Sequence, residues 1–100
     1  MFIPQATIHP TITTATWTKI NTVPAGVLQH LELHNEDAAA VYRWELVPVN
    51  GTVPTVATQG TPLGAGDRMI YTDDTIPNCD VYVYQASGGS LATLGLRQGI

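Results

Sequence analysis

Glycine and proline interrupt this sequence at short intervals, and their spacing is the feature that most constrains the fold. The segments between them are rich in Thr, Val, Ile, Tyr and Trp, and none carries apolar residues at the 3.6-residue period of a helix. Short runs of such residues between turn residues indicate β-strands. The sequence therefore predicts an all-β fold, an antiparallel β-sandwich (jelly-roll or Ig-like) of about seven or eight strands.

Turn residues set the expected strand limits. Asn50-Gly51 is a preferred pair for a type I′ hairpin turn, so the segments on either side are expected to pair with each other. Pro54 lacks a backbone donor, which favours an edge position for the second segment. The expected strands cover residues 11–20, 27–35, 41–49, 53–59, 68–72, 80–86 and 91–98.

Alternation within these segments predicts which side chains share a face. In residues 27–35 we expect two faces. One carries Val27, Gln29, Leu31 and Leu33, and the other carries Leu28, His30, Glu32 and His34. The same rule places the following residues together on one face of their own strands: Tyr42, Trp44 and Leu46; Val81 and Val83; Leu94 and Leu96.

The length of the chain and its charge limit the organisation and the function. One hundred residues suffice for one domain with one core. Residues 1–10 contain two prolines and no turn partner, so we expect an extended N-terminal arm followed by a sandwich domain over residues 11–100. Only 12% of the residues are charged, and eight Asp and Glu outnumber four scattered Lys and Arg, which argues against nucleic-acid binding.

Cysteine content and terminal sequence bear on the compartment. Cys79 is the only cysteine, so the chain forms no internal disulfide. Residues 1–5 have neither the basic segment nor the apolar run of a signal peptide, and no stretch has the length of a membrane span. We therefore expect a protein that is made and kept in the cytosol, or assembled there into a larger particle.

His30, Glu32 and His34 are the candidate metal-binding residues. Alternation puts all three on one face of one strand, where two imidazoles and a carboxylate are suitable ligands. Residues two apart on a strand are separated by about 6.6–7 Å, so a shared ion needs a further ligand from elsewhere, for which His9 is the remaining histidine. A polar face towards solvent or a neighbouring subunit is the favoured interpretation, so we expect no metal, cofactor or catalytic residue.

Two further residue groups have a structural and a functional interpretation. Four aspartates lack the spacing of a calcium loop, so turn capping is favoured over a cation site; they are Asp67, Asp73, Asp74 and Asp80.

The aromatic residues are expected to fill the core, with a sugar-stacking surface as the alternative. They are Trp17, Tyr42, Trp44, Tyr71, Tyr82 and Tyr84.

Several turn motifs resemble those of a known family. They are Thr-Val-Pro-Ala-Gly at 22–26, Leu-Glu-Leu-His-Asn at 31–35, Ala-Ala-Ala-Val-Tyr at 38–42 and Leu-Gly-Ala-Gly-Asp at 63–67. In this pattern, over about residues 16–97, the chain resembles the small β-sandwich structural proteins of tailed bacteriophage virions. It departs from them at 77–80, where Pro-Asn-Cys-Asp replaces a second glycine-aspartate step.

The resemblance implies a non-enzymatic virion structural protein located in a virion assembled in the host cytoplasm. A capsid decoration (cement) protein that stabilises the outer shell is the first expectation. A tail, neck or receptor-contacting component and a carbohydrate-binding module are the alternatives.

The expected partners are the major capsid protein or other virion proteins and further copies of the chain, with a trimer as the guess, and neither nucleic acid nor membrane. The arm is expected to bind partners by adding a strand to a neighbouring sheet. The candidate partner-binding residues are Phe2, Ile3, Pro4, Ile8 and Pro10.

Overall fold

The side chains of strand β2 (His30–Asn35) alternate between the inner and outer faces of one sheet. The computed structural model describes residues 6–12, 15–28, 30–72, 78–87 and 94–99. In it Leu31 and Leu33 are fully buried in the core, whereas Glu32 and His34 lie on the opposite face and are half-buried. The predicted alternation of these residues is confirmed.

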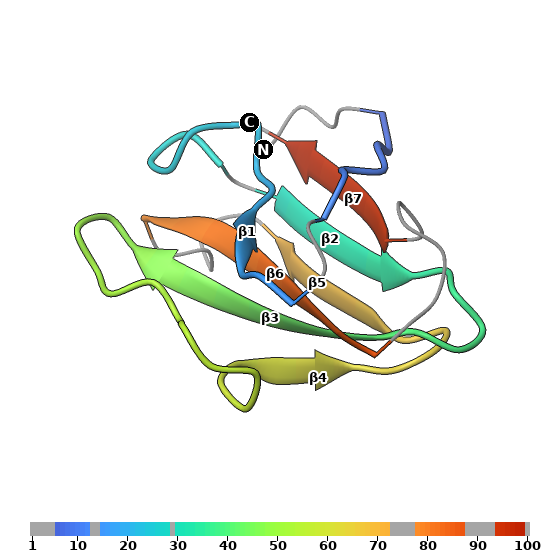
Figure 1. Cartoon of the computed structure of the whole chain (residues 1–100). Coiled ribbons are helices and arrows are strands. Elements are labelled where there is room, and N and C mark those ends of the chain that lie inside the picture. The colour runs from blue at the N-terminus through green and yellow to red at the C-terminus, as the bar shows by residue number, and fades with distance from the viewer. Residues whose placement is uncertain (1–5, 13–14, 29, 73–77, 88–93, 100) are drawn as a thin grey trace.

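The described residues form two antiparallel sheets (Figure 1). One sheet has the strand order β1-β6-β3-β4 and the other has the order β5-β2-β7. The predicted all-β, antiparallel sandwich architecture is thus confirmed, with seven strands in the described residues. Besides β2 they are β1 (Thr18–Lys19), β3 (Val41–Pro48), β4 (Thr61–Leu63), β5 (Arg68–Thr72), β6 (Cys79–Ser87) and β7 (Leu94–Gly99).

The two sheets share one hydrophobic core. Leu33 and Leu96 from the three-stranded sheet and Tyr42 and Val83 from the four-stranded sheet belong to the same buried cluster. Burying one large apolar side chain contributes about 1.5–3 kcal/mol, so this cluster is the main source of stability. The core also contains Ile12, which fixes the chain just after the N-terminal segment.

Asn35 at the end of β2 is a buried polar link between the sheets. Its Nδ2 donates hydrogen bonds to the carbonyl oxygens of Ala40 (2.8 Å) and Leu63 (3.0 Å). Its Oδ1 accepts a hydrogen bond from the backbone N–H of Asp37 at 3.0 Å. This side chain therefore fixes the turn between β2 and β3 and attaches it to β4.

A second buried amide, Gln98 on β7, anchors the turn that precedes β2. Its Oε1 accepts from the backbone N–H groups of Thr22 (2.9 Å) and Val23 (3.0 Å), and its Nε2 donates to the Thr22 hydroxyl at 2.8 Å. The neighbouring Asn21 accepts from the backbone N–H of Val81 at 2.9 Å. Amide side chains thus satisfy the turn backbone where it is buried between the sheets.

The predicted hairpin between residues 41–49 and 53–59 is wrong. The chain does turn at Asn50, which has a φ of 65°, and the N–H of Gly51 donates to the carbonyl oxygen of Pro48 at 2.7 Å. The partner of β3 on this side, however, is β4, which pairs Tyr42 with Leu63.

Side-chain hydrogen bonds explain why residues 53–59 do not form a strand. The Gln59 carbonyl Oε1 accepts from the backbone N–H groups of Thr55 (2.8 Å) and Val56 (3.1 Å). Arg43 donates to the backbone carbonyl oxygens of Gln59 (2.7 Å) and Gly60 (3.0 Å). These bonds occupy backbone groups that a strand would use for pairing.

Two other expected strands are shorter in the structure. In the described part of residues 11–20, which leaves out 13–14, β1 is the only strand, and Ala15, with a φ of 59°, is not extended. The expected strand 27–35 begins at His30, because the N–H groups of Val27 and Leu28 donate to the Pro24 carbonyl oxygen in a turn. Val27 is therefore 48% exposed and does not share the core face of Leu31.

Candidate binding site

The outer face of the three-stranded sheet gathers polar side chains from all three of its strands. Glu32 on β2 lies opposite Ile70 on β5 and opposite Arg97 on β7. His34, two residues further along β2, lies opposite Arg68 and Gly95. Residues that alternate outward on one strand thus meet those that do the same on its neighbours.

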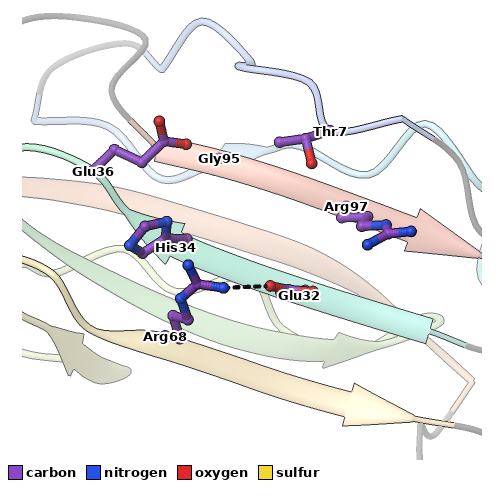
Figure 2. Close-up of a pocket in the computed structure, with 7 residues that line it drawn as sticks. All are labelled: Thr7, Glu32, His34, Glu36, Arg68, Gly95 and Arg97. Atoms are coloured by element: carbon purple, nitrogen blue, oxygen red, sulfur yellow. Dashed lines mark hydrogen bonds and ion pairs between the residues drawn. The ribbon is translucent and has the colours of Figure 1, made fainter.

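These side chains surround an open pocket of about 310 Å³ (Figure 2). Figure 2 shows the side chains placed around a central hollow above β2 and β7. The lining residues are Thr7, Glu32, His34, Glu36, Arg68, Gly95 and Arg97.

Glycine on β7 helps to create the hollow. Gly95 lies opposite His34 in the strand register and presents no side chain to the outer face. A Cβ at this position would overlap the Glu36 carboxylate and would touch the Thr7 side chain. The absence of a side chain at Gly95 therefore lets the segments before β1 and after β2 approach the outer face of β7.

The carboxylates of the pocket contact basic side chains. Arg68 Nη1 donates to Glu32 Oε1 at 3.1 Å, and His30 Nε2 lies 3.8 Å from Glu32 Oε2. Glu36 Oε2 is 2.9 Å from His9 Nε2. Each carboxylate that lines the pocket thus has a basic partner.

The N-terminal segment forms one wall of the pocket. Ile8 and Leu96 exchange two backbone hydrogen bonds, both of 2.8 Å, so the segment lies antiparallel to the open edge of β7 (Figure 1). This pairing places Thr7 beside the outer face, and the His9–Glu36 contact holds the same segment to the residue that follows β2.

The candidate metal residues share a face, as predicted, and His30 lies 3.8 Å from Glu32, but the hydrogen-bond partner of Glu32 comes from another strand. The Glu32 carboxylate is hydrogen-bonded to Arg68, and the third histidine, His9, contacts Glu36. His30 is buried at the start of β2, and His34 lines the pocket. Among the described residues, no three His, Cys, Asp or Glu side chains are grouped so that they could hold a metal ion.

Of the two described aspartates of the expected group, Asp67 caps a turn, whereas Asp80 lies in β6 and contacts another side chain. Asp67 Oδ2 accepts from the backbone N–H of Gly64 at 3.0 Å, in keeping with the turn-capping interpretation. Asp80 Oδ1 accepts from Asn21 Nδ2 at 3.0 Å. The other two, Asp73 and Asp74, lie outside the described residues.

The aromatic residues do not form one surface. Tyr42 is in the core, and Trp44 and Tyr71 pack against it from the two sheets with ring centroids 6.1 Å apart. Trp17 and Tyr84 form a separate pair with centroids 5.6 Å apart. This separation gives no support to a common sugar-stacking surface.

The candidate partner-binding residues are only partly described. Ile8 is 37% exposed at the edge of β7, and Pro10 is half-buried. Phe2, Ile3 and Pro4 lie outside the described residues. Binding of a partner by this arm stays a prediction.

Sequence patterns did not identify most of the pocket. Arg68 and Arg97 alternate outward on their strands, but only the strand order places them on either side of Glu32. Thr7 reaches the pocket through the pairing of the N-terminal segment with β7, which no local pattern indicates. Glu36 reaches it from the end of β2, beside Gly95 of β7.

Comparisons with protein-family models, with curated proteins and with solved structures returned no match for this chain. Within the described ranges, the structure contains no helix that is long and apolar enough to span a membrane.

Proposed function

We propose that this chain is a non-enzymatic structural protein of a bacteriophage virion, and specifically a capsid decoration protein that binds the outside of the shell and stabilises it. The turn motifs carry the resemblance to that class, and the all-β sandwich is the architecture that the resemblance implies. A structural protein of this kind needs a rigid scaffold with a surface for neighbouring subunits.

The observation that carries the proposal is the position of the N-terminal segment next to the charged outer face. Two of the four Lys and Arg residues of the chain, and two of its eight Asp and Glu residues, line one pocket that Thr7 of this segment also borders. Concentrated charge on an otherwise sparsely charged protein favours oriented association with a partner. The described part of the arm, residues 6–10, borders the charged face, so one partner can contact both.

Binding to virus particles tests the proposal. Particles that are purified without this protein are incubated with the full chain and sedimented. We expect the full chain to co-sediment in a copy number comparable to that of the major capsid protein and to raise the temperature at which the particles release their DNA. Absence of the chain from sedimented particles contradicts a virion function, and a small copy number set by tail symmetry contradicts decoration.

Two truncated chains test the role of the arm. Deletion of residues 1–10 removes the Ile8–Leu96 bridge and the His9–Glu36 contact but keeps Ile12 in the core. We expect this deletion to abolish particle binding while circular dichroism still shows a folded β-protein. Deletion of residues 1–5 keeps both contacts but removes the candidate residues Phe2, Ile3 and Pro4, so it separates their contribution from that of the segment that borders the pocket. Unchanged particle occupancy after deletion of residues 1–10 overturns the arm mechanism.

A further inference from the structure

The pocket contains hydrogen-bond donors that its own carboxylates do not use. Glu32 is 20% exposed and is paired with Arg68, and Glu36 is paired with His9. Among the described residues, no acceptor pairs with the guanidinium of Arg97, which lies on the exposed outer side of β7. A ligand that enters the pocket therefore meets an arginine available for binding.

Arg68 adds further donors to the same hollow. A guanidinium carries five N–H donors in a planar fork. One nitrogen of Arg68, Nη1, is bonded to Glu32, while the side chain as a whole remains 56% exposed. The Thr7 hydroxyl and the His34 ring border the same hollow and supply further polar groups (Figure 2). Such a set of donors matches a ligand that accepts hydrogen bonds.

The charges in the pocket favour a ligand with a single negative charge over a dianion. The lining contains two arginines and two glutamates, so their formal charges cancel before a ligand binds. A carboxylate gains a charge-assisted, two-pronged contact with a guanidinium. A dianionic phosphate brings a second negative charge close to Glu32 and Glu36, and like charges in one site repel each other.

We propose that this pocket binds the carboxylate of an Asp or Glu side chain of a protein partner, with Arg97 as the principal contact and Arg68 as the second. The inference rests on the proposed function, since it names the chemistry by which the charged face recognises its partner. The pocket volume, about 310 Å³, is at the lower limit for small-molecule sites and is sufficient for one acidic side chain. The opening lies beside the N-terminal segment, so the arm and the pocket contact the same partner.

Nuclear magnetic resonance of the full chain tests the inference without virus particles. The probe is N-acetyl-glutamate α-amide, which presents one side-chain carboxylate, and N-acetyl-glutamine α-amide is its uncharged isostere. We expect the glutamate compound to shift the Arg97 Nε–H signal and the backbone signals of Thr7, His34 and Gly95 in a saturable manner. Equal shifts with the glutamine compound, or tighter binding of inorganic phosphate, overturn the assignment of a carboxylate.

Two variants locate the binding. Arg97→Gln removes the charge without breaking a pair, and we expect it to weaken binding at least about tenfold. Lys19→Gln is the control, because Lys19 is exposed on β1 in the other sheet, and we expect it to leave the affinity unchanged. Binding by Arg97→Gln with the affinity of the unmodified chain overturns the inference.

The particle assay separates failure of the inference from failure of the proposed function. If the full chain binds particles but the glutamate compound shifts no pocket signal, the pocket assignment is wrong and the virion function stands. If the compound binds the pocket but the chain never associates with particles, the virion function is wrong and the carboxylate site stands.

Discussion

The side-chain amide of Asn35 on β2 donates a 3.0 Å hydrogen bond to the carbonyl oxygen of Leu63 on β4, and so joins the two sheets within the core. Both residues are buried, with exposed fractions of 0% for Asn35 and 3% for Leu63. When a buried carbonyl oxygen loses its hydrogen-bond donor, the free-energy cost of removing that oxygen from water is no longer compensated. This hydrogen bond between the two sheets therefore depends on the side chain of Asn35.

Replacement of Asn35 is expected to destabilise the fold strongly. Asn35→Ala leaves the carbonyl oxygens of Ala40 and Leu63 without this donor and removes the acceptor for the Asp37 N–H. We expect a loss of about 2–4 kcal/mol in the free energy of unfolding, measured by urea denaturation. Asn78→Ala, at an exposed position, is the control and should change it by less than about 0.5 kcal/mol. Similar losses in both variants contradict the role of Asn35.

Two substitutions that remove different numbers of Gln98 hydrogen bonds test how this residue stabilises the turn that precedes β2. Gln98→Leu leaves the backbone N–H groups of Thr22 and Val23 without their acceptor, and we expect a loss of about 2–3 kcal/mol. Thr22→Val removes only the hydroxyl that accepts from Gln98 Nε2, so the expected loss is about 1 kcal/mol or less. Thermal denaturation of the two variants shows which loses more stability, and a larger loss in Thr22→Val than in Gln98→Leu refutes the assigned contacts.

Two glycines with nearly the same φ allow the cost of backbone strain to be measured separately from the cost of steric overlap. Gly60 and Gly66 have φ values of +78° and +77°. A Cβ at Gly60 comes within 2.7 Å of Trp17 and of the Trp44 carbonyl oxygen, whereas a Cβ at Gly66 has nothing within 4 Å. We expect Gly66→Ala to cost about 1–2 kcal/mol and Gly60→Ala to cost at least about 1 kcal/mol more. Equal costs in chemical denaturation are incompatible with this packing.

The thiol of Cys79 is expected to be unreactive in the folded protein. Cys79 is fully buried at the start of β6, and burial, together with the neighbouring Asp80 carboxylate, raises the pKa of the thiol. Because the thiolate is the reactive form, a disulfide reagent should label the protein only when it unfolds. The labelling rate should increase with urea in parallel with unfolding. Rapid labelling of the native chain disproves the burial of this thiol.

The raised pKa also predicts how stability depends on pH. The folded state keeps the proton on Cys79 where the unfolded thiol, with a pKa of about 8.5, has lost it. The contribution of this group to stability is therefore full below pH ~8.5 and is lost as the pH rises towards the higher folded pKa. The difference in unfolding free energy between the unmodified chain and Cys79→Ala should fall over this range, and a rise would contradict the direction of the shift.

The sequence predicts the strand faces where burial follows a period of two. Leu31 and Leu33 point inward and Glu32 points outward because each strand alternates locally, whatever its partner. The choice of partner is not local. Asn50 turns the chain as predicted, yet β4 takes the expected place of residues 53–59, because side chains of Gln59 and Arg43 bind the backbone of that segment.

The pocket is harder to predict than the fold for the same reason. Glu32 was a candidate because of its spacing from His30 and His34, but its actual hydrogen-bond partner is Arg68, 36 residues further along the chain. Arg97 is placed opposite Glu32 by the pairing of β2 with β7. Only the order and register of three strands bring these groups together.

The odd-numbered and even-numbered residues of strand β7 have different roles. Leu94, Leu96 and Gln98 face inward and maintain the fold, whereas Gly95 and Arg97 shape the outer hollow. Mutations at the outward positions can therefore change the chemistry of the outer face without repacking the interior. Such a division lets one short segment accumulate changes on its outer side while the architecture that supports it is inherited unchanged.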